Sequence, residues 1–296
     1  MTFSELKTEI ANCSGMNFNT ASNVLQSKIF NLTKGDVIEL ISQIGAIPED
    51  IGHDSTEEKL YTKVSDILLA KSFMELGLSA SVLQQRADCA DVVAQSKYHP
   101  YSLVGDAKAF RLSRTARNQK DYKVTSMAHW REDNDYSVLV CPYFQYPNSR
   151  SQIYKDALNS NVCLFSWEYI YILLKENIEE SSSINLKDLW NQSHIIGKTT
   201  VVDNAKDCFL PAQNKNICDF IHIPDSKFNA YFNTLRTVIG DRGLEEIEYY
   251  KREIERVKQL DRDTAIKELL KSMKLESKIE TIERFIESIS NGAILK

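Results

Sequence analysis

Apolar residues recur at helical spacing through the first 80 residues of the chain. The pair Asp54-Ser55 is a helix cap in this pattern, and apolar positions then follow on one helical face at Leu60, Val64, Ile67 and Leu68, up to Gly77. The spacing predicts a helical N-terminal region over residues 1–80, in which helix packing explains the apolar positions.

The pattern changes between about residues 89 and 175, where short apolar runs alternate with polar segments. The runs predict strands at Ala90–Ala94, Leu103–Phe110, Ser137–Cys141 and Val162–Ser166. Helical spacing returns between them, at about Asp121–Glu132 and around Ile153–Leu158. Strands that alternate with helices predict an α/β fold, with a central mixed β-sheet flanked by helices.

The C-terminal part is helical again, with a near-heptad apolar seam at Ile247, Tyr250, Ile254 and Val257 and two further helices before Gly292. We expect these helices to pack as a bundle, although the same seam could join two subunits. Residues 181–243 show only a weak pattern. We therefore expect one domain over residues 1–296, built from a helical region (1–80), an α/β core (81–180) and a helical tail (244–296).

The composition is that of an ordinary globular protein, with 43% hydrophobic and 26% charged residues. No apolar run approaches the roughly 18 residues that span a bilayer, so we expect no membrane partner. The N-terminus lacks the order of a secretion signal, and the six cysteines are scattered, which predicts a cytoplasmic protein with free thiols. The histidines and cysteines lack zinc-site spacing, and nothing predicts an organic cofactor.

The candidate catalytic residues lie in the second apolar run, Leu103–Phe110. Side chains alternate along a strand, so Asp106 and Lys108 project from the same side. Acid-x-lysine triplets recur through the chain, but Asp106 is the acid that lies inside an apolar run. Asp91, at the start of the preceding run, supplies a second carboxylate. The alternative is that Asp106 is a surface acid at a strand end.

Two converging carboxylates supply the hard oxygen ligands that Mg²⁺ prefers. A neighbouring lysine would help to deprotonate the attacking water or stabilise negative charge at phosphorus. Asp91, Asp106 and Lys108 thus predict metal-dependent phosphodiester hydrolysis.

The segment after Lys108 is basic, although the whole chain carries a net charge of -5. From Asp106 to Thr125 there are six basic and two acidic residues. The segment carries phosphate-binding and base-reading types, namely Arg111, Arg114, Arg117, Asn118, Lys120 and Asp121. A basic residue at every third position is also typical of a solvated helix face. However, the segment directly follows the predicted acidic site, which favours DNA binding.

Several longer stretches resemble one known family. They include Phe110–Ala116, Asn118–Asp121, Trp130–Asp133, Phe144–Pro147, Leu164–Glu168 and Ser277–Glu283, beside Leu103–Lys108. In these the chain resembles the HindIII family of type II restriction endonucleases, within the PD-(D/E)XK nuclease superfamily. The resemblance implies a restriction-endonuclease-like core and a homodimeric, Mg²⁺-dependent enzyme that cuts double-stranded DNA at AAGCTT, after the first A.

Carried over by position, the resemblance implies that Asp91 and Asp106 hold metal, that Lys108 is the motif lysine, and that Asp121 and residues 117–120 lie at the DNA. Ala90 stands where the superfamily motif has proline. Gln84 stands where the family has an acid, so the third ligand stays open, with Glu58 and Asp88 as candidates. Two alternatives remain: a repair or junction-resolving nuclease of the same fold, and a non-catalytic DNA-binding protein.

Overall fold

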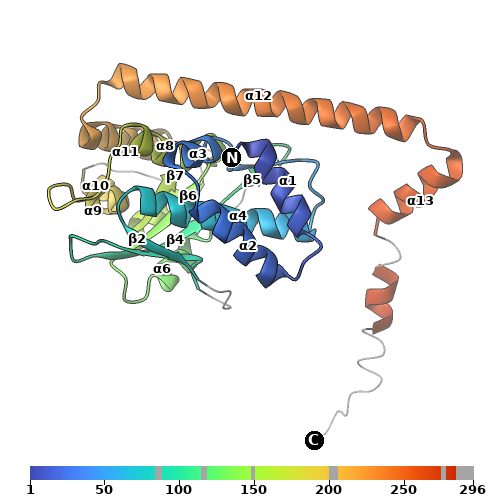
Figure 1. Ribbon diagram of the computed structural model, residues 1–296, viewed down its shortest axis with the longest axis horizontal. Helices are drawn as coiled ribbons and strands as arrows, with labels where there is room; N and C mark the ends of the chain where they lie inside the picture. The colour runs from blue at the N-terminus through green and yellow to red at the C-terminus, as the bar shows by residue number, and fades with distance from the viewer. Residues whose placement is uncertain (84–88, 115–118, 148–150, 200–205, 275–277, 285–296) are drawn as a thin grey trace, which may run out of the picture. The chain divides into compact units, whose positions relative to one another are not determined.

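The computed structural model describes residues 1–83, 89–114, 119–147, 151–199, 206–274 and 278–284. The chain divides into two compact units, Met1–Leu244 and Glu245–Lys296. Among the described residues, no helix combines the length and apolar character needed to cross a bilayer. The first unit contains the sheet and the helices that cover it (Figure 1).

The main sheet has five strands among the described residues, in the order β2-β3-β4-β6-β7. They are β2 (Ser79–Val82), β3 (Val92–Gln95), β4 (Ser102–Ala107), β6 (Tyr136–Cys141) and β7 (Val162–Ser166). The first three strands are antiparallel, whereas β4, β6 and β7 run parallel, so the sheet is mixed. This confirms the expected α/β fold.

Four helices precede the sheet: α1 (Phe3–Cys13), α2 (Phe18–Phe30), α3 (Lys34–Ile41) and α4 (Thr56–Glu75). Local capping fixes where they begin. Thr2 and Thr33 start α1 and α3 with complete capping boxes, and the Ser55 hydroxyl accepts a hydrogen bond from the Glu58 amide at 3.1 Å. The predicted helical N-terminal region is therefore confirmed.

Helix α4 is the central helix of the fold. Nearly every residue from Leu60 to Phe73 is buried, because α4 packs against β2, β3 and β4 on one side and α1, α2 and α3 on others. It ends before Gly77, whose φ of +88° favours glycine. A Cβ there would lie 2.8 Å from the carbonyl oxygen of Glu180.

The remaining helices follow or interrupt the parallel strands. They are α5 (Gln119–Tyr122), α6 (Val124–Trp130), α7 (Ile153–Ser160), α8 (Trp167–Lys175), α9 (Lys187–Trp190), α10 (Gln192–Thr199), α11 (Lys206–Ile221), α12 (Asp225–Lys258) and α13 (Arg262–Ser272). A short 3-10 turn, η1 (Tyr143–Gln145), follows β6.

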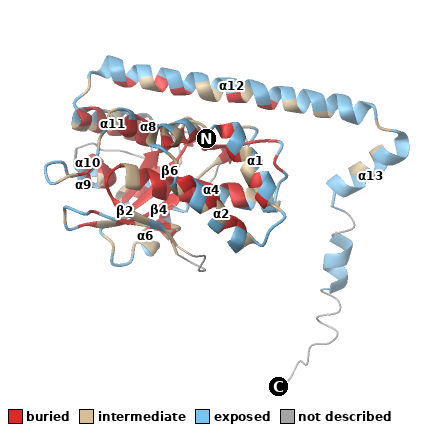
Figure 2. Cartoon of the chain, viewed as in Figure 1, coloured by how far each residue is buried: buried red, intermediate tan, exposed pale blue. Residues whose placement is uncertain are grey.

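The sheet separates two hydrophobic cores, and strand alternation assigns side chains to each. In β4, Leu103 and Ala107 belong to the core shared with α4, while Val104 belongs to the core on the opposite face. Helices α6, α7 and α10 cover that second face over β6 and β7. Figure 2 shows the buried residues concentrated in the strands and in α4.

Two predicted elements are each divided in the structure, whereas the strand predicted at Ala90–Ala94 is only shifted, to Val92–Gln95. The run Leu103–Phe110 is not one strand: β4 ends at Ala107, and the chain then pairs with β1 (Ala46–Ile47) through β5 (Phe110–Arg111) in a separate parallel pair. The helix expected at Asp121–Glu132 is broken at Lys123, whose φ is +48°, into α5 and α6.

The tail also differs from the expected bundle. In the described part of Glu245–Lys296, the seam residues Ile247, Tyr250, Ile254 and Val257 are exposed, and α13 has no buried residue. Over the described residues of this unit, the helices therefore do not bury their apolar faces against one another.

Candidate active site

The antiparallel register of β3 and β4 brings the two predicted acids together. Val92 pairs with Gly105 at the end of the ladder, so the next residues, Asp91 and Asp106, stand opposite each other. Asp106 is buried, whereas the Asp91 side chain is 36% exposed. The site is thus partly open where β3 begins.

A third carboxylate, Asp66, comes from the middle of α4. One ligand oxygen from each of Asp66, Asp91 and Asp106 lies within 4.8 Å of the others. The Ala107 amide donates a hydrogen bond of 3.2 Å to Asp66 Oδ1, which ties α4 to the end of β4. Asp66 was not among the residues predicted from the sequence, although an acid within the apolar stretch Val64–Leu68 was an available signal, because buried charges need partners.

Two lysines accompany the three acids. The Lys108 ammonium forms an ion pair with the Asp106 carboxylate, as expected from their shared side of the strand. Lys63, one turn before Asp66, places its Nζ 3.6 Å from Asp91 Oδ1 and donates a hydrogen bond of 3.2 Å to the carbonyl oxygen of Leu83. Sequence reasoning missed Lys63 as well.

The electrostatics of the cluster favour a bound cation. Burial raises the pKa of the Asp66 carboxyl well above its ordinary value, and the charges of Asp91 and Asp106 raise it further. Burial and Asp106 likewise raise the pKa of Asp91. Burial alone would lower the pKa of Lys108. The charge and hydrogen bond of Asp106 outweigh burial, so the pKa of Lys108 is raised.

These residues fit a divalent metal ion. Three carboxylates at mutual ligand distance supply hard oxygen donors, and burial together with the neighbouring carboxylates raises the pKa values of Asp66 and Asp91. Asp66, Asp91 and Asp106 are therefore the residues that would hold it.

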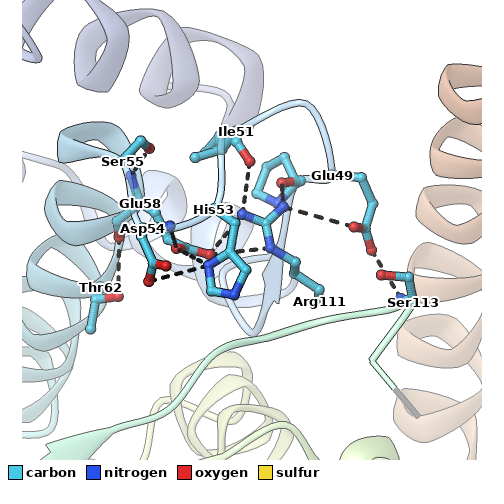
Figure 3. A network of polar contacts seen from close by, with 10 residues as sticks. Glu49, Ile51, His53, Asp54, Ser55, Glu58, Thr62, Arg111 and Ser113 are labelled. Carbon is cyan, nitrogen blue, oxygen red and sulfur yellow. Dashed lines mark hydrogen bonds and ion pairs between the residues drawn. The ribbon is translucent and has the colours of Figure 1, made fainter. Parts of the chain in front are cut away.

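Glu58 lies in a different network, drawn in Figure 3. Its Oε1 accepts a hydrogen bond of 2.7 Å from Arg111 Nη2, and its Oε2 lies 3.2 Å from His53 Nδ1. Burial raises the pKa of Glu58, but the hydrogen bonds from Arg111, the Asp54 amide and His53, together with the Arg111 charge, outweigh burial, and the net shift of the pKa is downward. The structure therefore does not bring Glu58 to Asp91 and Asp106.

Arg111 is held by the same network. Besides Glu58, its guanidinium donates to the carbonyl oxygens of Pro48 at 2.9 Å and Ile51 at 2.7 Å. Nearby, the Ser113 amide donates to Glu49 Oε1 at 2.9 Å (Figure 3). Arg111 thus fixes the start of the basic segment against the first turn of α4 and the loop that precedes it.

The rest of the basic segment is placed in part. Arg114 and Lys120 are exposed, and Arg114 forms an ion pair of 2.6 Å with Asp121. Arg117 and Asn118 lie outside the described residues, as do Asp88 and Gln84.

Two comparisons with known proteins bear on this site. A family model described as HindIII restriction endonuclease matches residues 4–286. The chain is also similar to the type II restriction enzyme HindIII of Haemophilus influenzae, with 44% identity over 288 residues that cover 97% of this chain and 96% of the relative.

Proposed function

The chain belongs to the HindIII restriction endonuclease family and is a type II site-specific deoxyribonuclease, and we propose that Asp66, Asp91, Asp106 and Lys108 form its catalytic centre. The observation that carries the proposal is the convergence of three carboxylates from α4, β4 and the start of β3. Phosphodiester hydrolysis is the chemistry that a restriction endonuclease performs on DNA, and this cluster supplies its ligands.

Type II restriction enzymes generally need a divalent metal ion, and we propose Mg²⁺ as the ion held by the three carboxylates. All the candidate ligands are hard oxygen donors, which suit Mg²⁺ better than a softer transition metal. When bound, the ion supplies polarisation of the scissile phosphate and a lowered pKa for the attacking water.

Lys108 has a defined role in this proposal. Its raised pKa keeps it protonated at neutral pH, so it serves to stabilise negative charge that develops on the phosphate rather than to accept a proton from water. Its ion pair with Asp106 holds the ammonium beside the carboxylates that receive the substrate.

DNA is the partner of a restriction enzyme, and we propose that the substrate is the palindrome AAGCTT, cut after the first A by a homodimer. The name of the Haemophilus relative and its 44% identity support this site. A symmetric site suits two identical chains related by a twofold axis.

The candidate base-reading residues are Arg114, Arg117, Asn118, Lys120 and Asp121. Because the donors of Arg111 are engaged by Glu58, Pro48 and Ile51, its role in this proposal is to hold the segment in place. We also propose a cytoplasmic location, which suits six cysteines that are all free thiols.

A digest tests the proposed function. Purified protein with Mg²⁺ should cut a sequenced plasmid into discrete fragments whose ends lie after the first A of AAGCTT, and EDTA should stop the reaction. Asp106→Ala and Lys108→Ala should abolish cleavage while circular dichroism shows a folded chain. Intact AAGCTT sites with folded wild-type protein would contradict the proposal, whereas preferential cutting of branched DNA would favour a junction-resolving nuclease.

A further inference from the structure

A groove lies next to the acid cluster, between α2 and α4. It encloses about 600 Å³, and Asp66 and Asp91 line one part of it. The other walls carry Asn19 from α2 and Lys59 and Thr62 from α4. These two helices are packed neighbours in the fold (Figure 1). Whatever occupies the groove therefore lies directly beside the proposed catalytic carboxylates.

The two lysines that line the groove lie on the same face of α4 as Asp66. Lys59, Lys63 and Asp66 are spaced four and three residues apart, so they share one face of α4. Lys63 is buried and contacts Asp91, whereas Lys59 is exposed. Lys63 thus compensates the charge of the acid cluster, whereas Lys59 faces the groove. Without Lys59, the three nearby carboxylates would repel a polyanion from the groove.

A second, independent observation comes from the α2 wall. A smaller hollow of about 270 Å³ shares Phe18, Asn19 and Lys63 with the groove, and it is also lined by Ser22. Ser22 is only 9% exposed, and its hydroxyl has no hydrogen-bond partner within the described part of the chain. Buried hydroxyls are normally paired, so an orphan that lines a hollow points to a ligand oxygen.

We propose that this groove and the adjoining hollow bind the sugar–phosphate backbone of the cleaved strand next to the scissile phosphate, through Lys59 and Asn19 in the groove and Ser22 in the hollow. This inference rests on the proposed function. Ammonium, amide and hydroxyl donors are the groups that proteins use against phosphate and sugar, and such contacts set the register of the protein on the duplex. The groove would thereby position the strand so that the scissile phosphate meets Asp66, Asp91 and Asp106.

The salt dependence of DNA binding tests the role of Lys59. Equilibrium binding of an AAGCTT duplex and a scrambled duplex is measured in EDTA over a series of salt concentrations. One lost phosphate contact lowers the slope of log K against log salt by about 1, so Lys59→Ala should reduce the slope by that amount and weaken both duplexes equally. Lys97→Ala, an exposed lysine at the opposite end of β3 from Asp91, is the charge-matched control and should keep the wild-type slope.

Ser22→Ala separates a binding role from a structural one. Because the hydroxyl has no partner in the free protein, its loss should leave the thermal unfolding midpoint unchanged or raise it. The same variant should bind both duplexes more weakly, on the order of tenfold, since it loses a hydrogen bond to a charged group.

The outcomes distinguish this inference from the function on which it rests. If the wild-type protein binds and cuts DNA but Lys59→Ala keeps the slope of Lys97→Ala, the groove is not a backbone site and this inference alone fails. A loss confined to the AAGCTT duplex would also overturn it, because that result indicates base contacts. If wild-type protein fails to bind either duplex, both the inference and the proposed function fall.

Discussion

At the residue scale, the main feature of the proposed active site is how its negative charges are compensated. Three carboxylates share a partly buried space with two lysines, of which Lys108 contacts Asp106 and Lys63 approaches Asp91. Within the described part of the chain, no cationic side chain lies within ion-pair distance of Asp66, and burial, as the largest cause, raises its pKa well above the ordinary value. A bound cation would therefore compensate the charge of Asp66 more than that of Asp91 or Asp106.

Asp66→Asn tests this assignment. The asparagine oxygen can still accept from the Ala107 amide, so the fold should persist, but the ligand charge is lost. We expect Mg²⁺-dependent cleavage to fall by about 100-fold or more, since the carboxylate belongs to the metal site. Without metal, the variant should be about 1–3 kcal/mol more stable, because a buried like charge is removed.

The measurements are cleavage rates over a Mg²⁺ titration and urea unfolding in EDTA. Asp133→Asn, at an exposed position, is the matched control and should behave as wild type. A wild-type rate with unchanged Mg²⁺ dependence in Asp66→Asn would remove Asp66 from the site.

Sequence reasoning found some of these residues and missed others for a physical reason. Asp106 and Lys108 stand out because strand alternation relates them directly, and Asp91 stands out because it lies at the start of the preceding apolar run. Asp66 and Lys63 lie on a helix, where polar residues are ordinary, and only the burial of α4 on every side shows that they face the sheet. Glu58, one of the two candidates for the third ligand, instead forms an ion pair with Arg111.

At the scale of elements, continuous apolar runs predicted β4, β6 and β7, because parallel strands are buried on both faces. The edge strand β2 escaped prediction, since Ser79–Val82 alternates exposed and intermediate positions with small side chains. The helices between residues 181 and 243 escaped too, because their apolar residues divide between the two cores, with Trp190 in one and Phe209 in the other. Their spacing therefore shows no single face.

The packing of α4 on β4 gives a prediction at Gly105. A Cβ at this position would lie 3.1 Å from Phe73 Cε2 and 3.2 Å from Leu69 Cδ2, so Gly105→Ala pushes the strand and helix apart next to Asp106. We expect a loss of about 1–3 kcal/mol in the free energy of unfolding and reduced cleavage. Gly240→Ala, in α12 with nothing within 4 Å of the added Cβ, should instead be neutral or stabilising by up to about 1 kcal/mol. Urea unfolding measures the stability of both variants. Equal free energies of unfolding for Gly105→Ala and Gly240→Ala would refute the packing argument.

Helix α8 begins with a buried acid that makes stability depend on pH. Glu168 is 5% exposed and accepts a hydrogen bond of 2.9 Å from the Tyr143 amide in η1. Burial raises its pKa to about 7 from 4.5. The folded state therefore holds this proton more tightly than the unfolded state, and stability falls as pH rises from about 4.5 to about 7.

Glu168→Gln should remove the loss of stability between pH 4.5 and about pH 7. The variant is expected to exceed wild type by up to about 3 kcal/mol at pH 8 and to match it near pH 4.5, where wild-type Glu168 is already protonated. Urea unfolding in EDTA at both pH values measures this difference. Glu132→Gln, at an exposed position, controls for the amide change; a pH-independent difference for Glu168→Gln would contradict the argument.

At the scale of the whole molecule, the exposed apolar seam of the tail bears on assembly. Ile247, Tyr250, Ile254 and Val257 are each at least 44% exposed, which is unusual for large apolar side chains at regular spacing along one helix. A homodimer is the state proposed for this enzyme, and a second copy of the same seam would cover these residues in the manner of a helical bundle.

Sedimentation equilibrium tests this expectation. The wild-type chain should sediment as a dimer at micromolar concentration, and Ile254→Lys should shift it toward monomer, because a charge in an apolar seam raises the cost of association. Lys251→Ala, on the same helix at an exposed charged position, is the control and should leave the dimer unchanged. A dimer of equal strength in Ile254→Lys would place the interface elsewhere.

The pairing of Asp91 with Asp106 through the β3–β4 register also constrains which insertions and deletions this enzyme tolerates. Loss of one residue inside β3 would shift the ladder, so that Ala90 instead of Asp91 would stand opposite Asp106, while the strand could still pair and fold. A length change in the turn after Ser96 leaves the register between Val92 and Gly105 intact. Among homologous chains, length variation compatible with DNA cleavage should therefore accumulate in that turn and be excluded from the four residues of β3.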